Sequence, residues 1–184
     1  MIELLAPAGN YECIVAAVQN GADAVYFAGE NYGARSYADN FDYKTLEKAV
    51  DYCRLRGVKS HITVNTLCTD RELIKCAQYI AFLAKIGVDA VIVQDLGVFN
   101  MIKQVCPQMP IHASTQMTVH NLDGVLTLQK MGAQRVVLSR ELSLENIKNI
   151  SENSDIELEV FAHGALCMCY SGQCLMSSVF GGRS

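Results

Sequence analysis

Three cysteines lie within eight residues near the end of the sequence: Cys167, Cys169 and Cys174. Thiolates are soft ligands, and a group of them suits an iron–sulfur centre or a zinc ion. His163, which precedes them, is a possible fourth ligand. However, a Cys-x-Cys spacing in so short a loop fits the usual zinc knuckles poorly. The spacing alone therefore leaves the metal open.

A second set of candidate residues is spread along the chain: most come directly after a short apolar run, and Glu159 lies within the last run. Parallel strands in a barrel bring their carboxyl ends to one mouth, where such enzymes place their catalytic groups. We therefore expect the polar residues that end these runs to meet. The candidate catalytic residues are Asn65, Asp95, Gln116, Arg140, Glu141, Glu159 and His163.

Three side chains, two of them from this list, have two interpretations each. His163 is either a proton-transfer or substrate-binding group, or a histidine with its hydrogen bonds satisfied within the barrel top. Glu159 shares a strand face with Phe161, so we expect it to point into the barrel and to need a partner, for which Arg140 is the natural candidate. That arginine forms a structural ion pair or binds an anion. Arg35 either binds a carboxylate-bearing small molecule or lies in an ordinary surface loop.

The remaining histidines and cysteines have simpler predicted roles. We expect His61 and His120 in loops or at the surface, and His112 inside the barrel with its hydrogen bonds made. Cys68 is predicted to lie in a loop. Four further cysteines fall among apolar residues in helical patterns, where a thiol behaves as a small buried hydrophobe; they are Cys13, Cys53, Cys76 and Cys106.

The elements that position these residues alternate strictly between strand and helix. The predicted strands are residues 2–6, 24–28, 60–65, 90–94, 111–114, 135–139 and 156–162. The predicted helices are residues 11–20, 43–56, 71–86, 98–105, 122–131 and 144–151. Glycine recurs where a helix ends and a strand begins, at Gly21, Gly87 and Gly132, as expected for a left-handed helix end. Such alternation implies a parallel sheet with right-handed crossovers.

A barrel fits this pattern better than an open dinucleotide-binding sheet. The turn after the first strand reads Pro7-Ala8-Gly9-Asn10 and lacks the Gly-x-Gly-x-x-Gly phosphate loop. Seven strands are recognisable, whereas a TIM-type barrel has eight. We therefore expect an incomplete (β/α) barrel that forms a single domain over residues 1–184 and is truncated at its C-terminal end.

The composition and the apolar segments bear on possible nucleic-acid binding, secretion and membrane association. The 184 residues are 51% hydrophobic and carry a net charge of −4, which gives no overall basic signature for nucleic acid. The N-terminus has no basic region and contains Glu3 in its first apolar run, so it does not resemble a signal peptide. No apolar stretch reaches the roughly 20 residues that span a bilayer. We expect a cytoplasmic protein with no membrane association.

The segment around the cysteines resembles the signature of peptidase family U32. The matching positions are Glu159, Phe161, Gly164, Ala165, Leu166, Cys167, Gly172, Cys174, Met176 and Ser177. The opening Glu-Leu-Leu-Ala-Pro-Ala-Gly, the Gly-Ala-Asp-Ala-Val-Tyr turn and the segment Ser114-Thr115-Gln116 are also similar to that family. The resemblance therefore covers the whole chain.

The resemblance implies several activities. Family members include collagenase-like proteases of unknown catalytic type, proteins of prephenate-dependent tRNA or rRNA hydroxylation, and proteins of oxygen-independent ubiquinone hydroxylation. Some carry a [4Fe–4S] cluster, and by resemblance its ligands here would be Cys167 and Cys174, with two more further downstream. Cys169 is not a family ligand. We therefore expect a cluster in a full-length protein and an absent or incomplete one in these 184 residues.

Three functions follow as hypotheses. By resemblance the chain is a collagenase-like peptidase, although His163 with Cys167 is the best nucleophile–base pair available and no His-Glu-x-x-His motif is present. The alternative is an iron–sulfur-dependent, prephenate-using RNA hydroxylation protein, which explains the cysteines better. A non-catalytic assembly subunit is the third. We also expect self-association through open strand edges, and binding of RNA or peptide through a region outside this chain.

Overall fold

The computed structural model describes residues 2–34, 41–165, 167–174, 176 and 179. The strands in this part are β1 (Leu5–Pro7), β2 (Ala24–Phe27), β3 (Lys59–Val64), β4 (Ala90–Val93), β5 (Ile111–Ala113), β6 (Arg135–Val137) and β7 (Glu157–Glu159). The helices are α1 (Tyr11–Gln19), α2 (Tyr43–Arg54), α3 (Asp70–Ile86), α4 (Leu96–Val105), α5 (Leu122–Met131) and α6 (Leu144–Glu152), with a 3-10 turn, η1 (Thr115–Met117).

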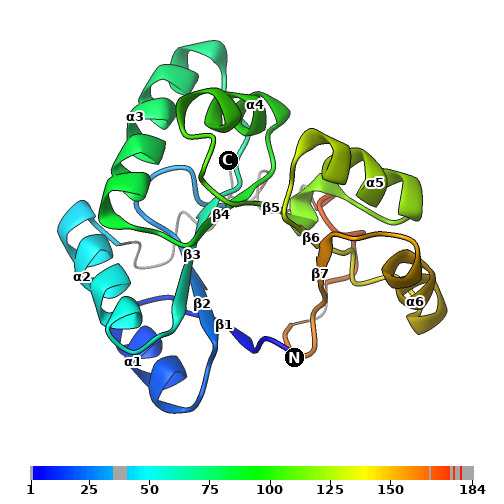
Figure 1. Ribbon diagram of the computed structural model, residues 1–184, viewed down its shortest axis with the longest axis horizontal. Coiled ribbons are helices and arrows are strands. Elements are labelled where there is room, and N and C mark those ends of the chain that lie inside the picture. The colour runs from blue at the N-terminus through cyan, green and yellow to red at the C-terminus, as the bar shows by residue number, and fades with distance from the viewer. Residues whose placement is uncertain (1, 35–40, 166, 175, 177–178, 180–184) are drawn as a thin grey trace.

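All seven strands form one parallel sheet in sequence order, β1 to β7. The sheet curves around a central interior, and the helices cover its outer side (Figure 1). The predicted incomplete (β/α) barrel is therefore confirmed. The prediction that it forms a single truncated domain stays an expectation.

Local sequence signals set the ends of the helices. Asn10, Asp42, Asn121 and Ser143 each accept a hydrogen bond from a main-chain amide in the first turn of the helix that follows. The helix α3 begins with a reciprocal capping box between Thr69 and Glu72. Helix ends are marked by glycines of positive φ, namely Gly21, Gly87 and Gly132, as the repeat predicted.

The apolar core lies between the sheet and the helices. Ile62 and Val91 on neighbouring strands are fully buried, as are Leu83 of α3 and Phe99 of α4. Three of the four helical cysteines are buried as predicted: Cys53, Cys76 and Cys106. The prediction for Cys13 is wrong. It is exposed, because α1 buries the neighbouring Ile14 and turns Cys13 to its outer side.

The interior of the barrel is polar. His61 of β3 and His112 of β5 lie with their ring centroids 4.7 Å apart and are 1% and 5% exposed. The prediction of a surface or loop position for His61 is therefore wrong, because parallel strands are buried on both faces. The interior position of His112 is confirmed. However, its Nδ1 atom and that of His61 have no hydrogen-bond partner among the described residues.

One side of the sheet stays open in the described part of the chain, since β1 and β7 are not paired with each other. Both edge strands are shorter than predicted: β1 begins at Leu5 rather than Ile2, and β7 ends at Glu159 rather than Ala162. With a neighbour on one side only, fewer ladder hydrogen bonds hold these ends extended. The edge is bridged instead by an ion pair, in which Arg135 Nη1 lies 2.7 Å from Glu3 Oε1. None of the helices described is long and apolar enough to cross a membrane.

Candidate functional site

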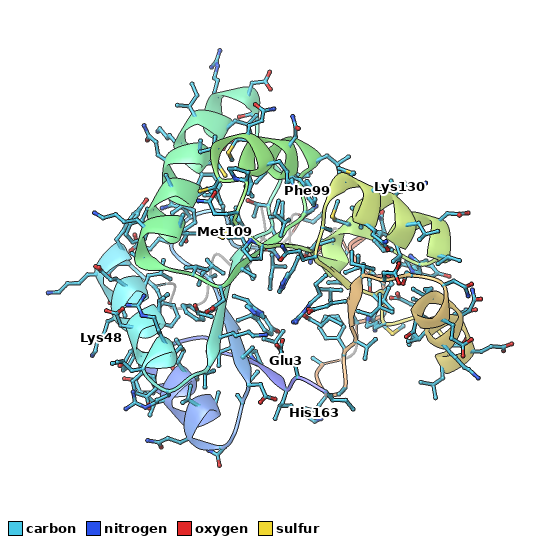
Figure 2. The ribbon with its side chains drawn as sticks, viewed as in Figure 1. Glu3, Lys48, Phe99, Met109, Lys130 and His163 are labelled. Carbon is cyan, nitrogen blue, oxygen red and sulfur yellow. The ribbon has the colours of Figure 1, made fainter. Side chains whose placement is uncertain are left out.

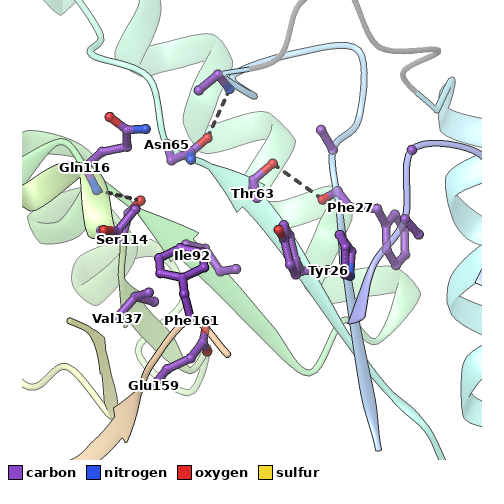
Figure 3. Close-up of a pocket in the computed structure, with 16 residues that line it drawn as sticks. Tyr26, Phe27, Thr63, Asn65, Ile92, Ser114, Gln116, Val137, Glu159 and Phe161 are labelled. Atoms are coloured by element: carbon purple, nitrogen blue, oxygen red, sulfur yellow. Dashed lines mark hydrogen bonds between the residues drawn. The ribbon is translucent and has the colours of Figure 1, made fainter. Parts of the chain in front are cut away.

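A cavity of about 220 Å³ opens at the carboxyl ends of the strands (Figure 3). Six of the seven strands contribute to its wall, and β5 is represented by the residues that directly follow it. The lining residues are Pro7, Ala8, Gly9, Tyr26, Phe27, Ala28, Ala34, Thr63, Asn65, Ile92, Ser114, Thr115, Gln116, Val137, Glu159 and Phe161. This is the end of a (β/α) barrel where ligands bind. Three of the candidate residues therefore do come together at the cavity, namely Asn65, Gln116 and Glu159.

The polar groups of the wall are partly committed to local hydrogen bonds (Figure 3). Asn65 Oδ1 accepts from the Ala34 amide at 3.0 Å, and Ser114 Oγ accepts from the Gln116 amide at 3.2 Å. The Thr63 hydroxyl lies 3.5 Å from the Phe27 carbonyl. By contrast, the buried Thr115 hydroxyl has no partner in the described part. Buried polar groups seldom stay unpaired, so Thr115 is available to a ligand.

Glu159 brings the one charged side chain among the described lining residues. It does not pair with Arg140, as the sequence suggested, but with Arg135, at 3.4 Å. The reason is register: Arg135 lies opposite Glu157 on the neighbouring strand, so its long side chain reaches the carboxylate two residues further along the same face. Burial raises the pKa of Glu159, and Arg135 offsets this only in part.

Arg135 anchors a charged layer beneath the cavity. Its side chain is 9% exposed and also binds Glu3 and Glu157, each at 2.7 Å. Burial alone would raise the pKa of Glu3, but hydrogen bonds from Arg135 and Lys59 outweigh it and hold that pKa at about 2. Burial lowers the pKa of His61 to about 4 and that of His112 to about 3, and Arg135 adds to both shifts. The two imidazoles are therefore neutral at pH 7.

The cysteine loop, which contains Cys167, Cys169 and Cys174, follows β7. Hydrogen bonds connect it to the loops after β5 and β6. Ser171 is its anchor: the amide and hydroxyl bind Glu141 Oε1 at 2.8 and 3.1 Å, and the carbonyl accepts from the Thr118 hydroxyl at 3.1 Å. Arg140 donates to the carbonyl of Cys169. Arg140 and Glu141 thus contact the cysteine loop rather than the cavity.

The thiols of Cys167, Cys169 and Cys174 come together in this loop, with their sulfur atoms all within 4.8 Å of one another. Thiolates are the ligands of iron–sulfur clusters, so Cys167 and Cys174 fit the role that the family resemblance implies. His163 does not belong to this group. Among the described residues the group offers three thiols, one fewer than the four ligands usual for such a cluster.

Two further candidates lie away from the cavity wall. Asp95 is the N-cap of α4: one carboxylate oxygen accepts from the Val98 amide and the other from the Cys68 amide, at 2.9 and 3.2 Å. His163 follows β7 and is exposed to solvent (Figure 2). Catalytic roles for these residues stay predictions. Arg35 lies outside the described residues.

The site also contains residues that the sequence reasoning missed. Tyr26 and Phe161 supply aromatic faces to the cavity, and Arg135 supplies the buried cation beneath it. The two-residue period of a strand had placed Phe161 on the face of Glu159, but no role in the site was drawn from it. Nothing local indicates Arg135, whose partner Glu3 is 132 positions away.

Fold and site together define a (β/α)-barrel protein with a ligand-sized cavity at the catalytic end and a thiol group beside it. The comparisons with known proteins narrow this class. The family model described as peptidase family U32 matches residues 9–184. The chain belongs to this family.

Relatives with curated names fall into two groups. The chain is 39% identical over 96% of its length to tRNA hydroxylation protein P1 of Bacillus subtilis, and 39% identical over 100% to 23S rRNA 5-hydroxycytidine C2501 synthase of Escherichia coli. It is 36% identical over 95% of its length to a collagenase of Porphyromonas gingivalis. The chain spans 42%, 27% and 44% of these proteins, respectively.

Solved structures support the fold. A U32 peptidase superposes with a TM-score of 0.74 at 16% identity, over 87% of this chain and 68% of that one. A 2,3-dimethylmalate lyase superposes with a TM-score of 0.66 at 15% identity, over 98% of this chain and 74% of that one. At such identities the likeness concerns the fold alone.

Proposed function

We propose that the chain takes part in hydroxylation of RNA bases, with the cavity as the binding site for a reactant. The observation that carries this proposal is the joining of the thiol group to the cavity wall. Gln116 lines the cavity, and its carbonyl lies so close to Gly172 that a Cβ atom there would come within 2.6 Å. A metal centre on the thiols would therefore be held by a loop that packs against the cavity wall. When bound, a [4Fe–4S] cluster supplies electron-transfer chemistry.

The wall suits a small, flat ligand. Tyr26 and Phe161 offer aromatic faces, and the side chains of Asn65, Gln116 and Thr115 offer hydrogen-bonding groups. A nucleobase stacks on aromatic rings and hydrogen-bonds through its edge, as single-stranded RNA does in other proteins. The prephenate that the resemblance implies as co-reactant would need a cation. The described lining contributes none; Arg35, which the sequence predicts as a carboxylate-binding residue, lies outside the described residues.

The relatives named for tRNA and rRNA hydroxylation support this proposal by their identity over nearly the whole chain. RNA is the proposed substrate, bound in part by regions that the longer relatives have beyond the matched stretch. A cytoplasmic location belongs to the proposal, as RNA is modified there.

A peptidase is the second candidate, favoured by the collagenase among the relatives. Its residue-level support is weaker. His163 and Cys167 are both exposed, and no hydrogen bond joins them in the described part. A nucleophile activated by a base requires that contact, at least in the working complex. A non-catalytic assembly subunit is the third candidate function.

Gene deletion in the host would test the proposal. We expect the loss of one hydroxylated nucleoside from hydrolysed tRNA or rRNA, measured by mass spectrometry, and its return with the wild-type gene. Gln116→Ala and Cys167→Ser genes should fail to restore it, while Cys13→Ser, an exposed cysteine outside the site, should succeed. An unchanged nucleoside profile, together with gelatin cleavage by the purified protein, would favour the peptidase instead.

A further inference from the structure

The charged layer beneath the cavity contains more carboxylates than cations. Its members are Glu3, Lys59, Arg135, Glu157 and Glu159. Arg135 lies 2.7 Å from Glu3 and from Glu157, and 3.4 Å from Glu159. Lys59 is the second cation and lies 2.7 Å from Glu3. Among the described residues of this layer, three ionised carboxylates therefore share two cations, and one negative charge is left over.

Glu159 is the carboxylate that receives the least compensation. Its contact with Arg135 is the longest of the three and involves only one of its oxygens, Oε2. Glu157 is 64% exposed, so water compensates that carboxylate, whereas the Glu159 side chain is 19% exposed. Burial accordingly raises the pKa of Glu159 in spite of Arg135. A carboxylate in such a position is stabilised when a ligand donates hydrogen bonds to it.

Glu159 also lies where a ligand can reach it. It lines the cavity, as do Val137 and Phe161 beside it (Figure 3). Val137 is its register partner on β6, and Phe161 follows it on the same strand face. These apolar side chains donate no hydrogen bond to the carboxylate. They also lower the local dielectric, which strengthens a hydrogen bond that a ligand makes there.

Possible ligands differ in what they offer to this carboxylate. The N4 amino group of cytosine donates N–H, and glutamate accepts from it in other complexes. Uracil carries a carbonyl oxygen in the same place, which can only accept and which a carboxylate repels. A carboxylate-bearing reactant is repelled as well. The aromatic faces of Tyr26 and Phe161 suit every flat base, so the discrimination rests with Glu159.

We propose that Glu159 is the specificity-determining residue of the cavity, which accepts an amino-bearing base such as cytosine and excludes uracil and anionic reactants. The inference rests on the proposed function, which makes RNA the substrate, and adds the class of base that the cavity takes. An anionic co-reactant then binds outside the described lining.

Titration of the purified chain with cytidine and with uridine, followed by nuclear magnetic resonance of the ligand, tests the selectivity. Slightly alkaline buffer favours the carboxylate form of Glu159. We expect cytidine to bind about tenfold more tightly than uridine, the ratio that one hydrogen bond to a charged group provides. Phthalate, a flat dicarboxylate, is the anionic probe and should bind more weakly than cytidine.

Glu159→Gln identifies the residue responsible. An amide can donate as well as accept, so this variant should bind cytidine about tenfold more weakly and lose the preference over uridine. Glu157→Gln is the matched control, because Glu157 lies on the same strand and contacts the same arginine but does not line the cavity. It should leave both affinities unchanged. Circular dichroism of each variant shows that it is folded.

Several outcomes would overturn the proposal: no binding of cytidine, equal binding of uridine or phthalate, or a preference that survives in Glu159→Gln. Tighter binding of N-acetylarginine amide than of cytidine, lost in Glu159→Gln, would also overturn it and would point to the arginine of a peptide. Failure of the proposed function is distinguishable from these results. A cytidine preference together with an unchanged nucleoside profile in the deletion host keeps the selectivity and overturns hydroxylation, and an altered profile without the preference does the reverse.

Discussion

Replacing Arg135 by methionine should destabilise the barrel strongly. Methionine keeps much of the volume but removes the cation from beneath the cavity. The Arg135 side chain is 9% exposed, and its partners Glu3 and Glu159 are 21% and 19% exposed. Glu159 would stay in place without a cation and Glu3 would keep only Lys59, at 2.7 Å, and a poorly compensated charge in such surroundings is costly.

The magnitude follows from how buried each pair is. Breaking a buried ion pair by removing one partner costs about 3–5 kcal/mol. Glu157 is 64% exposed, so its pair with Arg135 adds at most about 1 kcal/mol. Because Glu3 and Glu159 keep some contact with water, we expect a loss of about 3–4 kcal/mol at pH 7. For a chain of this size that corresponds to a Tm lower by roughly 6–15 °C.

The effect should depend on pH in a defined direction. The folded protein holds the pKa of Glu3 at about 2, below its ordinary value of 4.5. The stabilisation by this carboxylate is therefore complete above pH 4.5 and is lost as the pH falls from 4.5 towards 2. In the variant the carboxylates take up protons at higher pH, which relieves the unpaired charge. The difference between wild type and variant should shrink between pH 7 and pH 3.

Urea unfolding followed by circular dichroism, at pH 7 and at lower pH, measures both effects. Arg54→Met is the control: Arg54 pairs with Asp51 in α2, and the two side chains are 59% and 47% exposed. That change should cost less than about 1 kcal/mol. A loss for Arg135→Met no larger than for this control, or one that does not vary with pH, would refute the reasoning.

Three further predictions concern the cavity, the cysteine loop and the open edge. Because burial raises the pKa of Glu159, this side chain contributes to stability at low pH, and the contribution is lost as the pH rises above the ordinary value of 4.5. The Tm of Glu159→Gln should therefore rise relative to the Tm of wild type between pH 4 and pH 8. A Tm difference that stays constant over this range would contradict the prediction. Gly172→Ala should lower the free energy of unfolding in urea by at least about 1–2 kcal/mol, because Gly172 has a φ of +77° and an added Cβ atom would collide with Thr118 Oγ1. Gly164→Ala is the control: the space around Gly164 is open, so the loss should be well under about 1 kcal/mol. Finally, the unpaired edges of β1 and β7 in the described part should make the chain self-associate. Sedimentation over a dilution series measures this, and a monomer at high concentration would count against it.

Much of the fold could be predicted because its signals are local. The alternation of apolar runs with amphipathic segments gives strand and helix order, and Gly87 and Gly132 mark helix ends through a φ that other residues avoid. Asn65 and Gln116 were predicted at the mouth, since parallel strands have their carboxyl ends on one side, and Glu159 was predicted to point into the barrel; all three line the cavity. The N-cap role of Asp95 could also have been predicted from the sequence, because a carboxylate directly before a helix is a typical N-cap.

The sequence by itself therefore determined the order of the elements, the end of the barrel that carries the cavity, and the group of cysteines beside it. Only the tertiary structure decided which charges meet. Arg135 pairs with Glu3 across the open side of the sheet, and Arg140 turns to the cysteine loop instead of Glu159. Periodicity reports which face of a strand a residue occupies, and nothing more. The partner across the barrel depends on how far the sheet curves and on the register of strands distant in sequence, which the chain fixes only when the whole sheet has formed.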